Sequence, residues 1–392
     1  MMDLNTYHSG GVFLYVFCIA ILLSGCANPT ARKSGVVVEG FETTANIYPS
    51  VVDNYEIVPL EQTDNCILTG IKKIVRSDST YIIFDNYNNL VVRFDKNGKF
   101  LNPIGLKGRA ASEYLRIDTF TVDADGSVLI FNGSQDKVLV YGQDGEFISS
   151  VSFPKRTLGF INDAVSLDED RVLVNNCVYN NDNEIYRVLS LADKGVAKLV
   201  DFPVISDNIA EPTGRIPIGG CGRVVFLKPF DDTVYVLDDQ DAVVPLLSVG
   251  QSSKLVDDKY LKNHNVFSVA TTYGELSRDG YFTGFVSVFE TERYLLLVTY
   301  NDAYFLIDKG TNVGKYLRQG ICESYDGVPL MSIVAASSDD TLIGFYRPSD
   351  FIDKYNLSEI GPKLNETFSG FISVLSGLPE DGNPCLIVYH LR

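Results

Sequence analysis

One strand-turn-strand pattern occurs twice in this chain at a fixed spacing. The segments "VVRFDKNGKFL" and "VLVYGQDGEFI" carry their turn glycines, Gly98 and Gly145, 47 residues apart. One strand earlier, Phe84 and Phe131 have the same spacing of 47 residues. Two landmarks that share one spacing indicate an internal repeat. A period of about 40–50 residues made only of strand-like segments predicts a β-propeller with one four-stranded antiparallel blade per repeat.

Segments with this pattern continue to the C-terminus and predict six blades. The last blade lacks a fourth strand, whereas "NYEIVPLE" (Asn54–Glu61) is an unpaired strand at the other end. Pairing of Asn54–Glu61 with Cys385–Arg392 would close the ring and remove a free sheet edge. The expected fold is therefore an all-β, six-bladed β-propeller over residues 54–392, closed by the N-terminal strand joining the C-terminal blade. Insertions are expected at about 251–281 and 346–383.

The first 25 residues are distinct from the rest. Val12–Leu23 is an uncharged apolar run that matches a secretory signal in length and is too short to span a bilayer. It leads into Leu23-Ser24-Gly25-Cys26, which resembles the lipobox of bacterial lipoproteins. The resemblance implies a signal peptide over residues 1–25, acylation of Cys26 and a lipidated tether over residues 26–53. The alternative is a buried cysteine after an ordinary signal. One departure is that no Lys or Arg precedes the apolar run.

The propeller segments also resemble a known family. "YEIVPLE", "FDKNGKFLNPIG", "DDTVYVL" and "NPCLIVYHLR" resemble the six-bladed β-propeller lipoproteins of Bacteroidota, relatives of NHL-repeat and TolB-like propellers. That family carries a Gly-x-Gly-Pro-Gly-Glu-Tyr connector. Residues 108–114 here match it at Gly108, Glu113 and Tyr114 but not at the central Gly-Pro-Gly. The family has no settled activity to transfer. By the same resemblance, the non-acidic segment after Cys26 favours an outer-membrane anchor facing the periplasm.

Charge and composition exclude several classes of function. The net charge of −17 repels phosphate backbones and argues against nucleic-acid binding. The three histidines, His8, His264 and His390, are scattered, and no CxxC, G-x-S-x-G or H-E-x-x-H motif occurs. We therefore expect no catalytic residues, no metal ligands and no cofactor. The five cysteines after Cys26 are widely spaced and are interpreted as buried hydrophobic residues, with one disulfide left open.

The function expected from these features is binding. A membrane-anchored binding or scaffold lipoprotein would present a loop-rich propeller face to a protein, peptide or glycan, and would contact the bilayer through Cys26. The long insertions and connectors emerge on one face, whose candidate residues are Arg109, Glu113, Tyr114, His264 and Tyr273. A rival interpretation is that the insertions only cover apolar surface. The alternative function is a metal-dependent lactonase- or lyase-like enzyme with acidic and amide groups around an axial cation such as calcium.

Overall fold

The computed structural model describes residues 36–38, 41–44, 48–77, 79–176, 186–200, 223–228, 230–257, 269–300, 303–317, 333–349, 370, 372–374 and 377–392. Contacts divide the chain into two units, Met1–Ser34 and Gly35–Arg392, and all described residues belong to the second. Cys26 and the expected signal peptide therefore lie outside the described residues. None of the helices in the described ranges is both long enough and apolar enough to cross a membrane.

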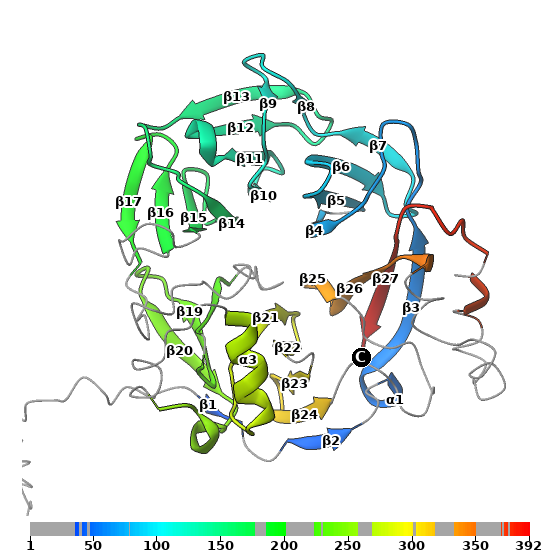
Figure 1. Ribbon diagram of the computed structural model, residues 1–392, viewed down its shortest axis with the longest axis vertical. Coiled ribbons are helices and arrows are strands. Elements are labelled where there is room, and N and C mark those ends of the chain that lie inside the picture. Colours follow the sequence, from blue (N-terminus) through cyan, green and yellow to red (C-terminus); the bar gives the residue numbers. More distant parts are fainter. Residues whose placement is uncertain are drawn as a thin grey trace, which may run out of the picture. The chain divides into compact units, whose positions relative to one another are not determined.

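Six blades stand in a ring in the second unit, as Figure 1 shows. Blades one to three follow chain order from the inner to the outer strand. They contain β4 (Ile71–Ser77), β5 (Thr80–Asp85), β6 (Leu90–Asp95) and β7 (Phe100–Pro103); β10 (Thr119–Val122), β11 (Val128–Asn132), β12 (Lys137–Tyr141) and β13 (Phe147–Ser152); and β14 (Ile161–Ser166), β15 (Arg171–Asn176), β16 (Tyr186–Ser190) and β17 (Gly195–Leu199).

Blades four to six combine strands from the second half of the chain with strands from its N-terminal part. The C-terminal contributions are β18 (Val225–Leu227), β19 (Thr233–Leu237) and β20 (Val243–Ser248); β21 (Phe285–Glu290), β22 (Tyr294–Thr299), β23 (Tyr304–Asp308) and β24 (Val313–Leu317); and β25 (Ile333–Ser337), β26 (Thr341–Tyr346) and β27 (Cys385–Leu391). The N-terminal contributions are β1 (Val36–Val37), β2 (Glu42–Thr44) and β3 (Val52–Pro59). The six-bladed, all-β prediction is confirmed.

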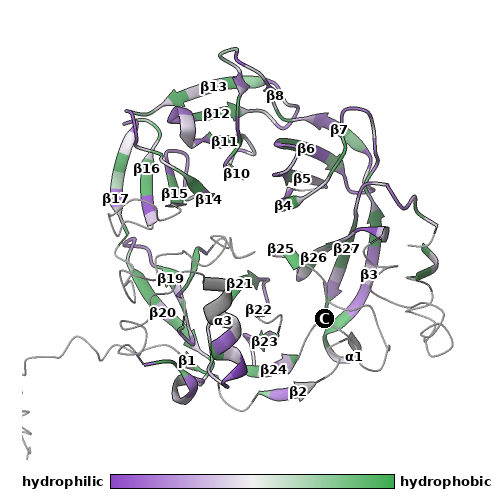
Figure 2. Ribbon diagram, viewed as in Figure 1, coloured by the Kyte–Doolittle hydropathy of each residue, from purple (hydrophilic) through white to green (hydrophobic). Residues whose placement is uncertain are grey.

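The N-terminal strand closes the ring as predicted. β3 pairs antiparallel with β27 along its length, from Val52 opposite Leu391 to Pro59 opposite Cys385. It is the outer strand of blade six, and its middle is coloured hydrophilic in Figure 2, as expected for an exposed edge. β3 and the last strand of the chain, β27, thus belong to one sheet, so that loss of either strand would open the ring.

The two repeat glycines serve the same purpose in successive blades. Gly98 and Gly145 lie in the turns before the outer strands β7 and β13, with positive φ angles of 82° and 86°. Each also approaches the last residue of the preceding blade's outer strand. A Cβ atom on Gly98 would lie 2.0 Å from Pro59 O, and one on Gly145 would lie 2.3 Å from Pro103 O. Both the turn and the close contact between blades therefore require glycine.

Residues 36–51, which we call the strap, run past two blades before the ring is closed. β1 pairs parallel with β20, and Val38 N donates to Ser248 O at 2.8 Å. β2 pairs parallel with β24 as a fifth strand of blade five. The helix α1 (Tyr48–Val51) then leads into β3. The expectation that the tether extends to residue 53 is corrected, because the chain joins the outer strands of blades four and five from Val36 onward.

The strap is fixed to blade five by an aromatic contact. The ring of Phe41 lies edge-on to that of Phe305, with centroids 4.8 Å apart. Gly314 on β24 leaves room for this ring, since a Cβ atom there would lie 2.2 Å from Phe41 Cε1. Buried Val38 joins the hydrophobic cluster between blades four and five.

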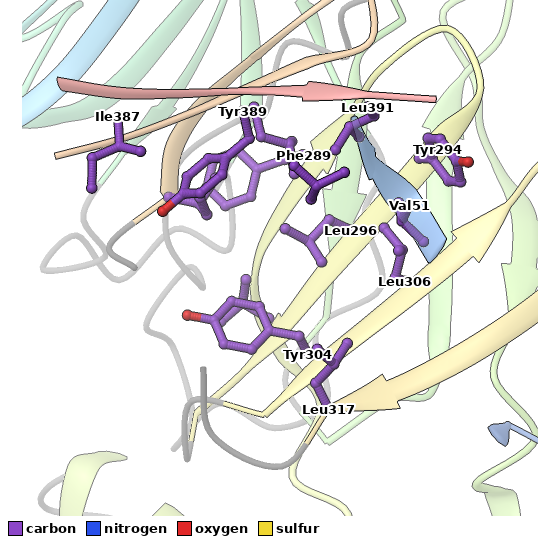
Figure 3. Close-up of a cluster of buried hydrophobic side chains, with 14 of the residues drawn as sticks. Val51, Phe289, Tyr294, Leu296, Tyr304, Leu306, Leu317, Ile387, Tyr389 and Leu391 are labelled. Carbon is purple, nitrogen blue, oxygen red and sulfur yellow. The ribbon is translucent and has the colours of Figure 1, made fainter. Parts of the chain in front are cut away.

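The hydrophobic core is divided into six clusters, one between each pair of neighbouring blades. Figure 3 shows the cluster between blades five and six, where Leu296 and Tyr304 of blade five face Tyr389 and Leu391 of β27. Val51 from the strap completes this cluster. Cys66 and Cys385 are buried free thiols, as interpreted from the sequence, whereas Cys177, Cys221 and Cys322 lie outside the described residues.

Candidate functional site

The loops of the ring fall into two sets that emerge at opposite ends of the strands, because neighbouring strands alternate in direction. One set joins successive blades or joins the second strand of a blade to its third. We call this set the connector face. It comprises the described parts of 60–70, 86–89, 104–118, 133–136, 153–160, 228–232, 249–284, 300–303 and 347–384. The other set consists of short turns between first and second or third and fourth strands, which we call the hairpin turns.

The positions of β18, β19 and β20 within blade four follow from the hydrogen bonds of that blade. Val249 N donates to Asp232 O at 3.0 Å, and in blade two the corresponding bond runs from Phe153 N to Asp136 O at 2.8 Å. β19 and β20 therefore match β12 and β13, the third and fourth strands of a blade, and β18 matches a second strand. The chain before β18, residues 201–222, lies outside the described residues.

Exposed large hydrophobic side chains are unevenly divided between these sets. Within the described residues there are fourteen, and none of them lies in a hairpin turn. Six lie on outer strands. The other eight lie on the connector face: Ile67, Tyr87, Leu106, Leu115, Phe160, Tyr281, Tyr300 and Val374. Within the described residues, the exposed large hydrophobic side chains that lie on loops are therefore confined to the connector face.

Tyr87 is the most exposed of these residues, with 76% of its surface accessible. Its ring lies against the backbone of Gly70, where a Cβ atom would stand 2.1 Å from Tyr87 Cδ2. Buried Asp85 fixes both loops, because its carboxylate accepts from Gly70 N at 3.1 Å and from Tyr87 N at 2.9 Å. The tyrosine is therefore presented on a rigid base, with low entropic cost for a contact on its free side.

Phe160 is presented in a different way at the inner end of blade three. The residue is 47% exposed, and its ring is contacted by the guanidinium of Arg116, whose Cζ lies 4.6 Å from the ring centroid. Arg116 Nε lies 3.2 Å from Asp118 Oδ1 at the start of β10. Burial raises the pKa of Asp118, and its bond from Gly133 N and the charge of Arg116 offset part of this rise. Arg116 thus connects exposed Phe160 to Asp118, one of the polar residues near the axis.

The connector that was singled out in the sequence forms a closed loop. β8 (Leu106–Lys107) pairs parallel with β9 (Glu113–Tyr114), and Glu113 Oε2 accepts from Ala110 N at 2.8 Å. Tyr114 is only 2% exposed and packs between blades one and two. Its side chain therefore belongs to the core and is not available at the surface. Arg109 is exposed at the tip of the loop.

The other two predicted residues come from the insertion at 251–281. This insertion contains η2 (Ser252–Lys254) and α3 (Val269–Arg278). His264 lies outside the described residues, and Tyr273 lies on α3 with its side chain also outside the description. Most of the insertion at 346–383 is likewise undescribed, apart from short segments that include the helical residues 372–374.

Polar side chains that were not predicted from the sequence meet around the axis. Lys73 of β4, Thr119 of β10 and Asp163 of β14 occupy equivalent positions on the inner strands of blades one to three. Lys73 Nζ lies 2.6 Å from Asp163 Oδ1, and Thr119 Oγ1 donates to the same oxygen at 3.1 Å. Lys73 and Asp163 are both buried. The available signal was the alignment of Ile-Lys-Lys (71–73), Ile-Asp-Thr (117–119) and Ile-Asn-Asp (161–163) at the start of three successive repeats.

A second lysine, Lys72, binds backbone oxygens at the same site. Lys72 Nζ donates to Asp118 O at 3.2 Å and to Asn162 O at 3.1 Å. Both ammonium groups are thus engaged by oxygens of blades two and three, and the acidic groups face cationic side chains. In the described part of the chain, no three His, Cys, Asp or Glu residues are grouped as metal ligands. The arrangement joins the inner strands of three blades around the axis.

The comparisons with known proteins agree with this architecture. The profile of a family described as "Domain of unknown function (DUF4934)" matches residues 39–390. No curated protein matches the chain. A crystal structure of a Bacteroides fragilis protein inferred to be exported is 19% identical, with a TM-score of 0.67 over 91% of this chain and 100% of that chain.

Two further solved structures are less similar. A member of the DUF4221 family from Bacteroides vulgatus is 11% identical, with a TM-score of 0.53 over 87% of this chain and 97% of that chain. The virginiamycin B lyase of Staphylococcus aureus reaches a TM-score of 0.43 at 12% identity, over 74% of this chain and 80% of that chain. At these identities the Bacteroides structures support the fold alone, and the similarity to the lyase carries no functional argument.

Proposed function

Because the chain belongs to the DUF4934 family, whose description assigns no activity, we propose a function from the candidate site alone. The protein is a binding protein of the cell envelope. Its connector face recognises a protein, peptide or glycan partner. The observation that carries this proposal is the division of exposed apolar side chains, which are frequent on the connector face and absent from the described hairpin turns. Aromatic side chains held on rigid loops are typical anchors of binding interfaces.

The proposal is tested by removing the anchors without changing the ring. The variant Tyr87→Ser/Leu115→Ser/Phe160→Ser changes three exposed connector-face residues. The matched control Leu101→Ser/Val196→Ser/Val313→Ser changes three residues of similar exposure on outer strands. Each purified protein is immobilised and incubated with solubilised envelope from the native bacterium, and retained proteins and glycans are quantified. Retention by the wild type and the control but not by the connector-face variant supports the function. Equal retention by all three contradicts it.

We further propose that the protein is exported and held on a membrane by lipid on Cys26, with the propeller facing the periplasm. The support is the lipobox-like Leu23-Ser24-Gly25-Cys26 after an apolar run and the exported status inferred for the Bacteroides fragilis protein of similar fold. A more distant relation to NHL-repeat and TolB-like propellers is part of the same proposal. Replacement of Cys26 by Ser should release the protein from membranes in fractionated cells. A variant that stays in the membrane fraction would place the anchor elsewhere.

The alternative function, a lactonase- or lyase-like enzyme, depends on the acidic residues near the axis. Asp118 and Asp163 are the residues that such a site would use, but their carboxylates face Arg116 and Lys73. A cation entering there would have to displace a buried ammonium group, which is costly. Binding is therefore the function that the site supports better. Millimolar calcium should leave the melting temperature unchanged, whereas a marked rise would favour the enzyme.

A further inference from the structure

The outer strand of a propeller blade has a free edge, and five of the six blades protect it. β20 and β24 are covered by β1 and β2 of the strap. β3 carries Asp53, Asn54 and Glu56 along its length. β7 has only four residues, the last of which is proline, and β17 carries Lys198, whose Nζ donates to Asp241 O at 2.6 Å. Pairing, charge, shortness and proline are the usual ways of blocking such an edge.

Among the residues that the structure describes, none protects β13, the outer strand of blade two, in any of these ways. Its sequence, Phe-Ile-Ser-Ser-Val-Ser, contains no charge and no proline, and Figure 2 shows no strongly hydrophilic stretch along it. Five of its six side chains are exposed, with Ile148 at 58%. It is the last strand of its sheet and the outermost arrow of its blade in Figure 1. Such a bare edge is ordinarily avoided unless another strand pairs with it.

The direction of the backbone groups of β13 follows from its ladder. Phe153 N donates inward to Asp136 O, and residues of an antiparallel strand alternate between inward and outward hydrogen bonding. With Val151 opposite Val138 and Ser150 opposite Leu139, the backbone groups of Ser152 and Ser150 therefore face away from β12.

In blade four, the equivalent outer edge is paired with an added parallel strand. There Val249 N makes the equivalent inward bond to Asp232 O, so that Ser248 corresponds to Ser152 of β13. Ser248 O faces outward and accepts from Val38 N at 2.8 Å, where β1 adds as a parallel strand. The segments that the ring accepts in this manner contain the β-branched pairs Val36–Val37 and Thr43–Thr44.

We propose that β13 is a second binding site of this protein, which takes an extended, β-branched segment of a partner polypeptide as an added parallel strand. Main-chain hydrogen bonds to the outward groups of Ser150 and Ser152 supply the affinity, and exposed Phe147 and Ile148 contact alternate side chains of the added strand. This site lies on an outer strand, so it is distinct from the connector face.

The test uses a peptide that contains both segments of the strap that pair in parallel with outer strands, Val36–Val37 with β20 and Glu42–Thr44 with β24. A fluorescent peptide with the sequence of residues 35–44, GVVVEGFETT, is titrated with the purified protein, and its anisotropy is measured. Saturable binding to the wild type is expected. Ser150→Pro should lower the affinity at least tenfold, because it removes an outward N–H that β12 does not use. Ser150→Thr keeps the N–H group and should bind within twofold of the wild type.

Three results would overturn the proposal. The wild type could fail to bind the peptide. Binding could be unchanged by Ser150→Pro, as expected if the peptide merely displaces the strap from blade four or five. The protein could instead dimerise in sedimentation experiments and be dissociated by Ser150→Lys, which would make a second copy the occupant. Because Ser150→Lys leaves the backbone N–H in place and adds a charge to the edge, it also replaces Ser150→Pro as the binding test if the proline variant does not fold.

Discussion

Lys73 Nζ lies 2.6 Å from Asp163 Oδ1, so a single ion pair joins the inner strand of blade one to that of blade three. Thr119 of the intervening blade donates to the same carboxylate oxygen at 3.1 Å. The other oxygen, Asp163 Oδ2, is buried without a hydrogen-bond partner in the described residues. A buried pair of this kind contributes little net stability while intact but becomes costly when one partner is removed. It therefore holds three blades in one arrangement around the axis.

Replacement of Lys73 by Met should destabilise the ring strongly. The substitution leaves the Asp163 carboxylate buried without its counter-charge, a loss that typically costs about 3–5 kcal/mol in the free energy of unfolding. Chemical denaturation followed by circular dichroism measures the change. The double variant Lys73→Met/Asp163→Asn removes the stranded charge and should recover a large part of the loss. Additive losses in the double variant would mean that the two side chains are not coupled.

Ring closure predicts that the N-terminal strand stabilises the whole propeller. A chain that begins at Gln62 lacks β3 and the strap, so the edge of β27 is open and Val51, Val52 and Val58 are lost from two interblade clusters. We expect it to lose the single cooperative melting transition of the full protein. A chain that begins at Gly35 keeps every described strand and serves as the control. Equal melting temperatures for both shortened chains would contradict closure by β3.

The two described cysteines should be chemically silent in the folded protein. Burial raises the pKa of Cys66 and of Cys385 to about 12 in each case, partly offset at Cys66 by a hydrogen bond from Asn383. Since the thiolate is the reactive form, a pKa of 12 leaves roughly one thiol in ten thousand ionised at pH 8. Iodoacetamide at pH 8 should therefore modify neither residue until denaturant is added, as read by peptide mass spectrometry. Rapid modification of either cysteine in the folded protein would contradict the burial of both thiols.

Much of the fold was predictable from the sequence because turns have strict local requirements. The positive φ angles at Gly98 and Gly145 need glycine, so the repeat was visible as a spacing between two residues. Ring closure was predictable because Asn54–Glu61 had no partner of its own and the last blade lacked a strand. The strap was missed, since β1 and β2 have only two and three residues and pair in parallel without a turn to mark them.

The candidate site was predicted only in part, because side-chain direction depends on register. The pairing of β4 and of β14 shifts by one residue at Lys72 and Asn162, which turns Lys73 and Asp163 toward each other. No periodicity in the sequence reveals such a shift. Tyr114 was expected on the surface and is buried between blades, since parallel pairing of β8 and β9 turns its ring inward. Tyr87 was overlooked, because its exposure depends on contact with the distant backbone of Gly70.

Crosslinking in the native envelope can show whether the connector face holds the partner. A photoreactive phenylalanine is placed singly at Tyr87 or Phe160 on the connector face, and at Asn97 or Gln240 in exposed hairpin turns. After irradiation of intact cells, adducts with protein or glycan are detected by gel shift and mass spectrometry. We expect adducts from Tyr87 and Phe160 and only background from Asn97 and Gln240. Equal yields from both sets of positions, or adducts from the hairpin turns alone, would contradict it.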